Sequence, residues 1–388
     1  MLHACRSWPA APWGASVLVF ALTQFAAAQR PEYQFLFGLR ERGMHAEALA
    51  YLERGPTGAD RSRLFEEDLP FELLISRIDV ASQIDDPVRR WEAVEPLGKQ
   101  LEQMLEKNEE VPRFEGGCAK LMQLHLWRAR QQLELAQDAE HAQQREAARR
   151  ACREQLRRAE EFHQRADEAI SNTLHLVGTV FSDDSEVISV RAQRGRDYQS
   201  VWLLEAQMLE LHGRLADPDS VQRRVFLERA AEEYEGLWER YRNRIVGLEC
   251  RLEQARLLVE LQQTDQAVKL MAAFHDELLL VPDEEEVRPL VPKSLCILLA
   301  CRRFPRDEPY SEALIRAREW LRRSRRPQRT TPDGLEVRWL LVQSLVRLQQ
   351  QEANSVTRAE LGTEIERHLE LLAPHREAAA TLLESLRE

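Results

Sequence analysis

The segment RIVGLECRLEQARLLVEL (residues 244–261) and the segment TDQAVKLMAAFHDELL (residues 264–279) carry the pattern that decides the fold. In both segments apolar side chains recur every three or four residues, which places them on one face of an α-helix. Gln262, Gln263 and Thr264 form the turn, and Thr264 is suited to cap the second helix. The stretch therefore predicts two amphipathic helices. Their apolar faces consist of Ile245, Leu248, Leu252, Ala255 and Leu258, and of Ala267, Met271, Phe274 and Leu278.

The composition extends this prediction to the whole chain. Glycine is scarce, at 15 of 388 residues, against a usual share of about 7%. Ala, Leu, Glu, Gln and Arg predominate, and these residues lose little side-chain freedom in a helix. Apolar stripes also recur between 119 and 170, the second of them at near-heptad spacing, and predict one long helical hairpin there. We expect an all-α protein.

The chain from 29 to 388 reads as about twelve to fourteen helices joined by short turns, without a linker that would divide it. Sequential helices that cover one another's apolar stripes form a single array with a continuous core. The weakest part is 55–110, where Pro70, Pro87 and Pro96 interrupt the pattern. Further along, Gly116-Gly117 is interpreted as a turn before a helix, and a helix is expected from about Val287 to Phe304. Pro305 and Pro309 then punctuate the chain.

The segment PEYQFLFGLRERGMHAEALAYLERG (residues 31–55) contains a helix ending near Gly43 and an Ala-rich helix with Ala48 and Leu52. It resembles the tetratricopeptide (TPR) repeat, whose small residues let two helices approach closely. Ala255 and Ala267 stand at comparable positions in the opening stretch, whereas Leu36 occupies a position where the family prefers Gly.

The resemblance implies an α-solenoid, a right-handed superhelix of antiparallel helix pairs. In that family the first helices of successive pairs line the inner groove, which holds a peptide segment or another protein. On this chain the resemblance makes Arg251, Gln254 and Leu258 candidates for such contacts.

Residues 1–28 have the pattern of a secretory signal peptide, with Arg6, an apolar core from about Ala15 to Leu22, and a small-residue run that ends at Ala28. The apolar core is shorter than the ~20 residues of a membrane-spanning helix, so cleavage after Ala28 is favoured over an uncleaved anchor. No later segment is long and apolar enough to span a bilayer. We expect a periplasmic or extracellular protein.

Five cysteines follow the predicted signal, an odd number for an oxidising compartment, so at least one thiol is expected to be free or paired between chains. We interpret most of them as small buried residues on helix faces. They are Cys118, Cys152, Cys250, Cys296 and Cys301.

The net charge of −11 disfavours nucleic acid as a partner, because such a surface repels phosphate backbones. One basic stretch stands out, in which five arginines lie between 322 and 329. It could contact anionic lipid, an acidic partner or nucleic acid, but a loop beyond a helix end is the preferred interpretation, since cations suit a helix C-terminus. Its residues are Arg322, Arg323, Arg325, Arg326 and Arg329.

Motifs that carry chemistry are not found. The chain has no HExxH, calcium loop, phosphate-binding glycine loop or GxSxG elbow, so no cofactor, metal or catalytic residue is predicted. Two histidine pairs, His163 with His175 and His368 with His375, are interpreted as structural. The preferred function is therefore a non-catalytic scaffold of the bacterial envelope that binds a protein or peptide.

A glycan-acting enzyme or enzyme subunit on a helical barrel is the alternative. It would need one carboxyl group kept protonated in an apolar pocket. The carboxylates at 183–184 and 284–286 belong instead to polar helix starts, and Glu384-Ser385 lies too near the end to support a site. A third possibility is a module of a larger complex, whose terminal stripe with Leu382 and Leu386 another chain covers.

Overall fold

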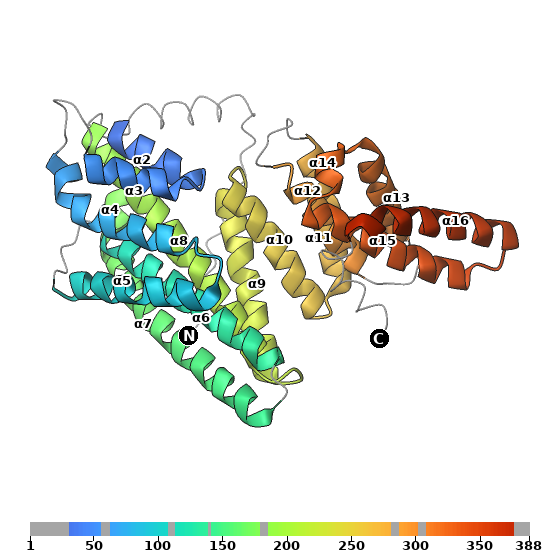
Figure 1. Ribbon diagram of the computed structural model, residues 1–388, viewed down its shortest axis with the longest axis horizontal. Helices are drawn as coiled ribbons and strands as arrows, with labels where there is room; N and C mark the ends of the chain where they lie inside the picture. Colours follow the sequence, from blue (N-terminus) through green and yellow to red (C-terminus); the bar gives the residue numbers. More distant parts are fainter. Residues whose placement is uncertain are drawn as a thin grey trace. The chain divides into compact units, whose positions relative to one another are not determined.

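The computed structural model is helical throughout the part of the chain that it describes (Figure 1). These residues form fifteen α-helices, α2 to α16, and one short 3-10 helix, η1, and no strand occurs among them. The prediction of an all-α protein is confirmed. The described residues are 31–55, 63–107, 113–138, 141–178, 185–280, 287–301 and 308–375.

The chain divides into two compact units, Met1–Leu204 and Glu205–Glu388, with the division inside helix α8. In unit 1 each helix from α2 to α6 packs against the next helix along the chain. The helices of unit 1 are α2 (Pro31–Glu41), α3 (His45–Arg54), α4 (Arg63–Ala81), α5 (Pro87–Lys107), α6 (Phe114–Asp138), α7 (Ala142–Gly178) and the first part of α8 (Ser185–Leu215).

The first helix pair of unit 1 forms as predicted. Gly43 has φ +71°, a left-handed conformation that glycine adopts without steric cost, and the chain turns there between α2 and α3. The amide of Met44 donates to the carbonyl of Leu39 at 2.9 Å, so a carbonyl at the end of α2 stays satisfied. Leu36, Ala48 and Leu52 are buried together between the two helices.

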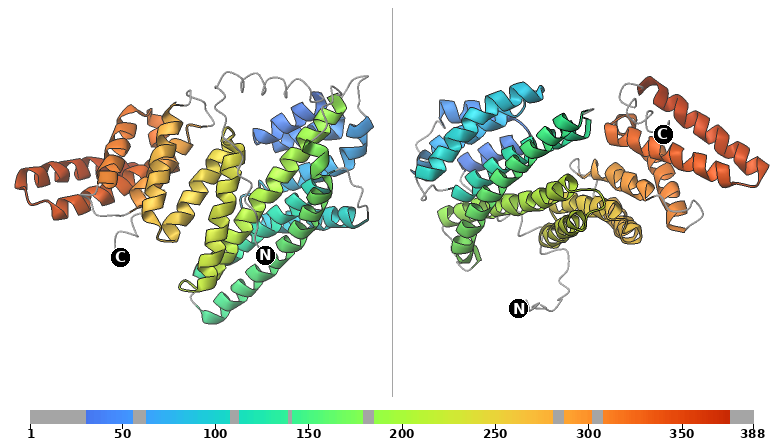
Figure 2. Two further views of the ribbon diagram at one scale, coloured as in Figure 1. Left: turned by 180° about the vertical axis from the view of Figure 1, so that it is seen from behind. Right: turned by 90° about the horizontal axis from the view of Figure 1, so that it is seen from below.

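The long hairpin predicted around 119–170 is confirmed and is longer at both ends. It consists of α6 and α7, which lie side by side along most of their length (Figure 2). The predicted stripe of α6 is buried, and so is the stripe of α7 from Cys152 to Ile170.

The prolines between 55 and 110 do not interrupt the helices, so this part of the sequence interpretation is wrong. Pro87 is the first residue of α5, where a helix needs no amide hydrogen. Pro70 and Pro96 lie inside α4 and α5, where each removes a backbone hydrogen bond. The helices continue because apolar side chains are buried after Pro70 in α4 and on both sides of Pro96 in α5. These include Phe71, Leu74 and Ile78 of α4, and Val94, Leu101 and Leu105 of α5.

Unit 2 repeats the pattern of neighbouring helices. Each helix from α9 to α12 packs against the next one, α12 and α13 both pack on α15, and α16 packs on α15. The helices are α9 (Val221–Tyr241), α10 (Ile245–Glu260), α11 (Thr264–Leu280), α12 (Leu290–Ala300), α13 (Glu308–Arg323), α14 (Arg326–Arg329), α15 (Pro332–Gln351) and α16 (Ser355–Leu372), followed by η1 (Ala373–His375).

The opening stretch of the sequence forms α10 and α11 and supplies the centre of the unit 2 core. Leu258 of α10 and Met271 and Phe274 of α11 are buried in one apolar cluster, which continues to Trp339 of α15. The turn places Gln262 at φ 62°, and α11 begins at Thr264 as expected.

Three boundaries in unit 2 differ from the sequence prediction. The helix expected from Val287 to Phe304 is α12, which spans only Leu290–Ala300, because residues 287–289 form a turn. Pro309 is the second residue of α13 rather than a break, since a first turn tolerates proline. The basic stretch is not a loop: its first two arginines end α13, and Arg326–Arg329 form the short helix α14.

None of the helices among the described residues is sufficiently long and apolar to cross a membrane.

Gly247, in the opening stretch, provides a test of the close approach between α9 and α10. A Cβ atom there would overlap the backbone carbonyl of Tyr241. We expect Gly247→Ala to lower the free energy of unfolding by about 1–3 kcal/mol, as overpacking against rigid backbone does. Gly236 of α9 is the matched control, because a Cβ there meets nothing within 4 Å. Gly236→Ala should raise stability by about 0.5–1 kcal/mol. Urea unfolding measures both, and equal effects would contradict the packing of α9 on α10.

Candidate functional site

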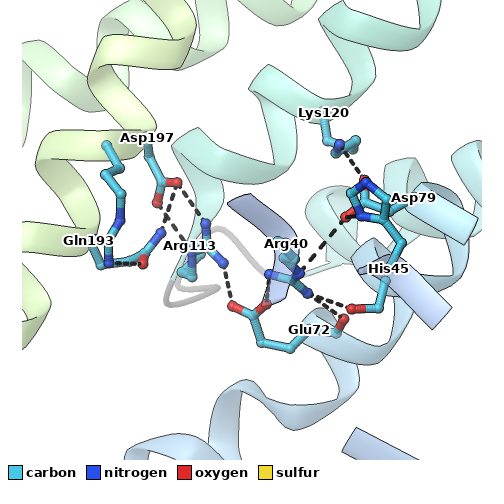
Figure 3. Close-up of polar contacts among 10 residues, drawn as sticks. Arg40, His45, Glu72, Asp79, Arg113, Lys120, Gln193 and Asp197 are labelled. Atoms are coloured by element: carbon cyan, nitrogen blue, oxygen red, sulfur yellow. Dashed lines mark hydrogen bonds and ion pairs between the residues drawn. The ribbon is translucent and has the colours of Figure 1, made fainter. Parts of the chain in front are cut away.

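Unit 1 contains a group of charged and polar side chains that is almost closed to solvent, and we call it the buried charge network (Figure 3). Helices α2, α3, α4, α6 and α8 all contribute to it, together with the residue just before α6. Its members are Arg40, His45, Glu72, Ser76, Asp79, Arg113, Lys120, Gln193 and Asp197.

Glu72 of α4 is the centre of the network and has no exposed surface. Arg40 Nη1 donates to Glu72 Oε2 at 2.6 Å, and Arg113 Nη1 donates to Oε1. Burial by itself would raise the pKa of Glu72, but the charges of Arg113 and Arg40 outweigh burial and hold that pKa below its ordinary value. Glu72 is therefore held as a carboxylate by its two arginine partners.

Arg113 extends the network from α4 to α8. Its Nη2 and Nε donate to the two carboxylate oxygens of Asp197, at 2.7 and 3.2 Å, in a bidentate pair. Gln193 Nε2 donates to Asp197 Oδ1 at 3.1 Å. The charges of Asp197 and Glu72 raise the pKa of Arg113 above its ordinary value, although burial opposes them.

Gly116 shows why the glycine pair of α6 belongs to this network. A Cβ atom at Gly116 would lie 2.7 Å from Asp197 Oδ1, and one at Gly117 would lie 2.9 Å from a methyl group of Leu105. The predicted turn at this pair is wrong, because both glycines lie inside α6. Their role is to let α6 approach α5 and the Asp197 carboxylate of α8.

The other end of the network joins α2 and α6 to α4. Arg40 Nη2 donates to Ser76 Oγ at 2.7 Å, and Lys120 Nζ donates to Asp79 Oδ1 at 2.7 Å. His45 Nδ1 and Arg40 Nε each lie 3.8 Å from Asp79 Oδ2. Each of the three carboxylates in the network therefore has a cationic partner.

The ring of Phe37 contacts the two arginines of this network and also Arg196 of α8, next to Asp197. The guanidinium carbon of Arg196 lies 4.3 Å from the ring centre of Phe37, and those of Arg113 and Arg40 lie 5.7 and 5.9 Å from it. Cation–π contacts of this kind stabilise guanidinium groups that are withdrawn from water. Together these contacts make the network a structural tie between helices.

A second buried polar pair lies in unit 2, where His275 of α11 meets Ser294 of α12. The Ser294 hydroxyl donates to the carbonyl of Val291 at 2.7 Å, so it accepts a hydrogen bond from Nδ1–H of neutral His275 at 2.8 Å. Burial, assisted by the charge of Arg316, lowers the pKa of His275 to about 4. A serine beside a histidine suggests a nucleophile and its base. Here, however, both side chains are buried and the serine proton points away from the histidine.

The candidate groove residues do not form an open surface. Gln254 and Leu258 are buried, and Arg251 is half-buried, with its guanidinium 5.3 Å from the ring centre of Trp238 and its Nη1 donating to Gln254 at 2.8 Å. The expectation that these three contact a partner is therefore wrong for Gln254 and Leu258. Leu258 belongs to the apolar core of unit 2, and Gln254 accepts its hydrogen bond from Arg251 of the same helix.

The histidines and cysteines singled out from the sequence have structural surroundings. His368 of α16 is an interhelix residue, as expected, since its Nδ1 lies 2.9 Å from Arg338 Nη1 of α15. The five cysteines after the predicted signal are buried and free of disulfide bonds, and burial raises the pKa of the thiols, that of Cys118 to about 12. Poor exposure and a raised pKa are typical of unreactive thiols.

Glu160 and His163 lie three residues apart on α7, a spacing found in some metal sites. Across the part of the chain that the structure describes, no three His, Cys, Asp or Glu side chains gather as metal ligands. The carboxylates at 183–184 and 284–286, Glu384-Ser385 and the predicted signal at 1–28 lie outside the described residues.

No protein-family model, curated protein or solved structure matches this chain.

The buried charge network predicts a large loss of stability when its central carboxylate is removed. Glu72→Gln leaves Arg40 and Arg113 buried with less compensation, and we expect a loss of roughly 3–5 kcal/mol in the free energy of unfolding. The matched control is Glu95→Gln, since Glu95 pairs with Lys99 at an exposed site and such pairs contribute about 0–1 kcal/mol. Chemical denaturation compares the variants, and a small effect at Glu72 would contradict the network.

His275 predicts a loss of stability in mild acid. Its folded pKa of about 4 lies below the ordinary 6.5, so the unfolded chain takes up a proton first. Keeping His275 neutral contributes about 3 kcal/mol to the free energy of unfolding above pH 6.5. This contribution is lost as the pH falls from 6.5 towards about 4. His275→Asn should flatten this dependence. Unfolding at several pH values measures it, and parallel curves for wild type and variant would refute the assignment.

Proposed function

We propose that this protein is a non-catalytic scaffold of the bacterial envelope that binds a peptide segment or a protein partner. The observation that carries the proposal is the packing of consecutive helices against one another in both units. Helix pairs stacked in sequence order create extended surfaces, which such proteins use for binding. We further propose that these pairs are degenerate TPR-like repeats of one array over 29–388, as the residues around Gly43 and in the opening stretch suggest.

Exposed apolar side chains support a function by contact. Leu279 and Leu280 end α11, and Ile315 lies on α13, all with more than half of their surface exposed. Arg316 joins these helices, since its Nη1 and Nη2 donate to the Asp276 carboxylate at 2.5 and 3.0 Å. Exposed apolar groups on neighbouring helices are typical of interaction surfaces.

We also propose that residues 1–28 direct export of the protein. The envelope location rests on the signal-peptide pattern of that segment alone.

The alternative, a glycan-acting enzyme, is favoured by one observation. Burial raises the pKa of Glu336 on α15, with Asp333 adding to the effect and Arg256 opposing it. A carboxyl group with a raised pKa is what the acid of a glycosidase needs. Glu336 is half-buried, however, and the neighbouring Trp339 is buried and cannot stack on a sugar.

Affinity capture with a catalytic assay in parallel tests the scaffold against the enzyme. The purified chain from residue 29 is immobilised, exposed to envelope extract, and competed with free chain. We expect a partner that free chain displaces, and no release of soluble glycan from cell-wall material. Glycan release that Glu336→Gln abolishes would establish the alternative, and the absence of any displaceable partner would contradict the scaffold.

A further inference from the structure

The short helix α14 presents arginines that have no acidic partner. Arg325 and Arg326 are exposed, Arg329 is half-exposed, and no carboxylate of the described residues lies within ion-pair distance of any of the three. By contrast, the preceding arginines of α13 share one acid, with Arg323 at 2.6 Å from Glu319 and Arg322 at 3.9 Å. Within the basic stretch, the arginines of α13 are therefore paired with an acid, whereas those at α14 are not.

Arg338 of α15 is a second and independent observation. It is 6% exposed, yet its only hydrogen bond among the described residues is with Nδ1 of His368, at 2.9 Å, and not with an acid. Arginines so deeply buried are normally paired with acids, as Arg113 is with Asp197. Burial lowers the pKa of Arg338, and the charges of Arg329 and Arg367 lower it further. The charged groups that act on Arg338 are thus themselves positive.

Helix α14 packs on α15 and lies at the end of the α15–α16 pair where α15 begins (Figure 1). The two helices are antiparallel, because Arg338 meets His368 while Gln349 donates to the carbonyl of Arg358. The loop after α15 closes the far end of the pair, and α14 enters at the opposite end through Thr330 and Thr331. Arg367 of α16 follows Glu366 and precedes His368 in the chain, and its charge acts on Arg338, as does that of Arg329 next to α15. Glu364 of α16 lies 3.8 Å from the other ring nitrogen of His368, Nε2, so it is one side chain removed from Arg338.

We propose that Arg325, Arg326 and Arg329, with Arg338 and Arg367 behind them, form a docking surface for an acidic segment of a partner protein. This inference rests on the proposed scaffold function and names its site and partner chemistry. Guanidinium forks bind carboxylates in bidentate pairs, so Asp and Glu side chains match these arginines. The surface is about one helical turn long and suits a short segment. The net charge of −11 works against long polyanions such as nucleic acid.

Binding of a fluorescein-labelled, glutamate-rich peptide to the full chain, followed by fluorescence anisotropy, tests the proposal. We expect binding that weakens with salt, and a dissociation constant roughly tenfold higher in the double variant Arg325→Glu, Arg326→Glu, which corresponds to about 1.4 kcal/mol. The control Arg224→Glu, Arg229→Glu makes the same charge change at exposed sites of α9 in the same unit. It should alter the constant by no more than about twofold.

Arg338→Met separates a binding role from a packing role. The side chain loses a charge whose neighbours are positive, so we expect weaker peptide binding, by about threefold, with an unchanged or higher melting temperature. A lower melting temperature with unchanged binding would overturn the role of Arg338.

Other outcomes also decide the proposal. Absence of peptide binding, or an equal loss in both double variants, overturns it. Preferential binding of a DNA oligonucleotide, or of phosphatidylserine vesicles, through Arg325 and Arg326 overturns it in favour of that ligand. A partner captured by the wild type and retained by the Arg325→Glu, Arg326→Glu variant would remove this surface but leave the scaffold function intact.

Discussion

The enclosure of Glu72 between two arginines is the constraint on which unit 1 depends. A fully buried carboxylate is tolerated only when cations and hydrogen bonds replace the water it has lost. Arg40 comes from α2 and Arg113 from the residue before α6, so both must be in place for α4 to be buried at Glu72. The requirement passes on to Asp197 of α8 through Arg113. Apolar packing brings these helices together, and the charges define which helix meets which.

Unit 2 is held in a different way, by a continuous apolar core that extends from α9 to α16. Its polar interior is small, with His275 and Ser294 satisfying each other and the Val291 carbonyl. Arg338 is the exception, because its hydrogen bond is with His368 rather than with an acid, and the charges of Arg329 and Arg367 add to burial in lowering its pKa. Buried charges without a compensating partner cost stability. This contrast between Arg113 and Arg338 supports the proposal that an acidic partner binds at the α14 end of the α15–α16 pair.

The sequence predicted part of this structure and almost none of the candidate site. Helix periodicity predicted the α6–α7 hairpin and the α10–α11 pair because a buried stripe repeats locally, within one turn. The same reasoning missed helix continuity through Pro70 and Pro96, since tertiary packing offsets a lost hydrogen bond that local rules count as decisive. It also missed Glu72, Arg113 and Asp197, which are separated by 41 and 84 positions and have no motif to announce them.

The sequence by itself determined that this protein is helical, where most helices lie, and which side chains form their apolar faces. These properties depend on residues three or four positions apart. Only the tertiary structure decided which charges are paired and which are left alone. Gly116 reads as a turn in the sequence, and Arg338 reads as one arginine among many. The burial and pairing of these residues depend on helices that are distant in the chain, and local periodicity cannot predict those contacts.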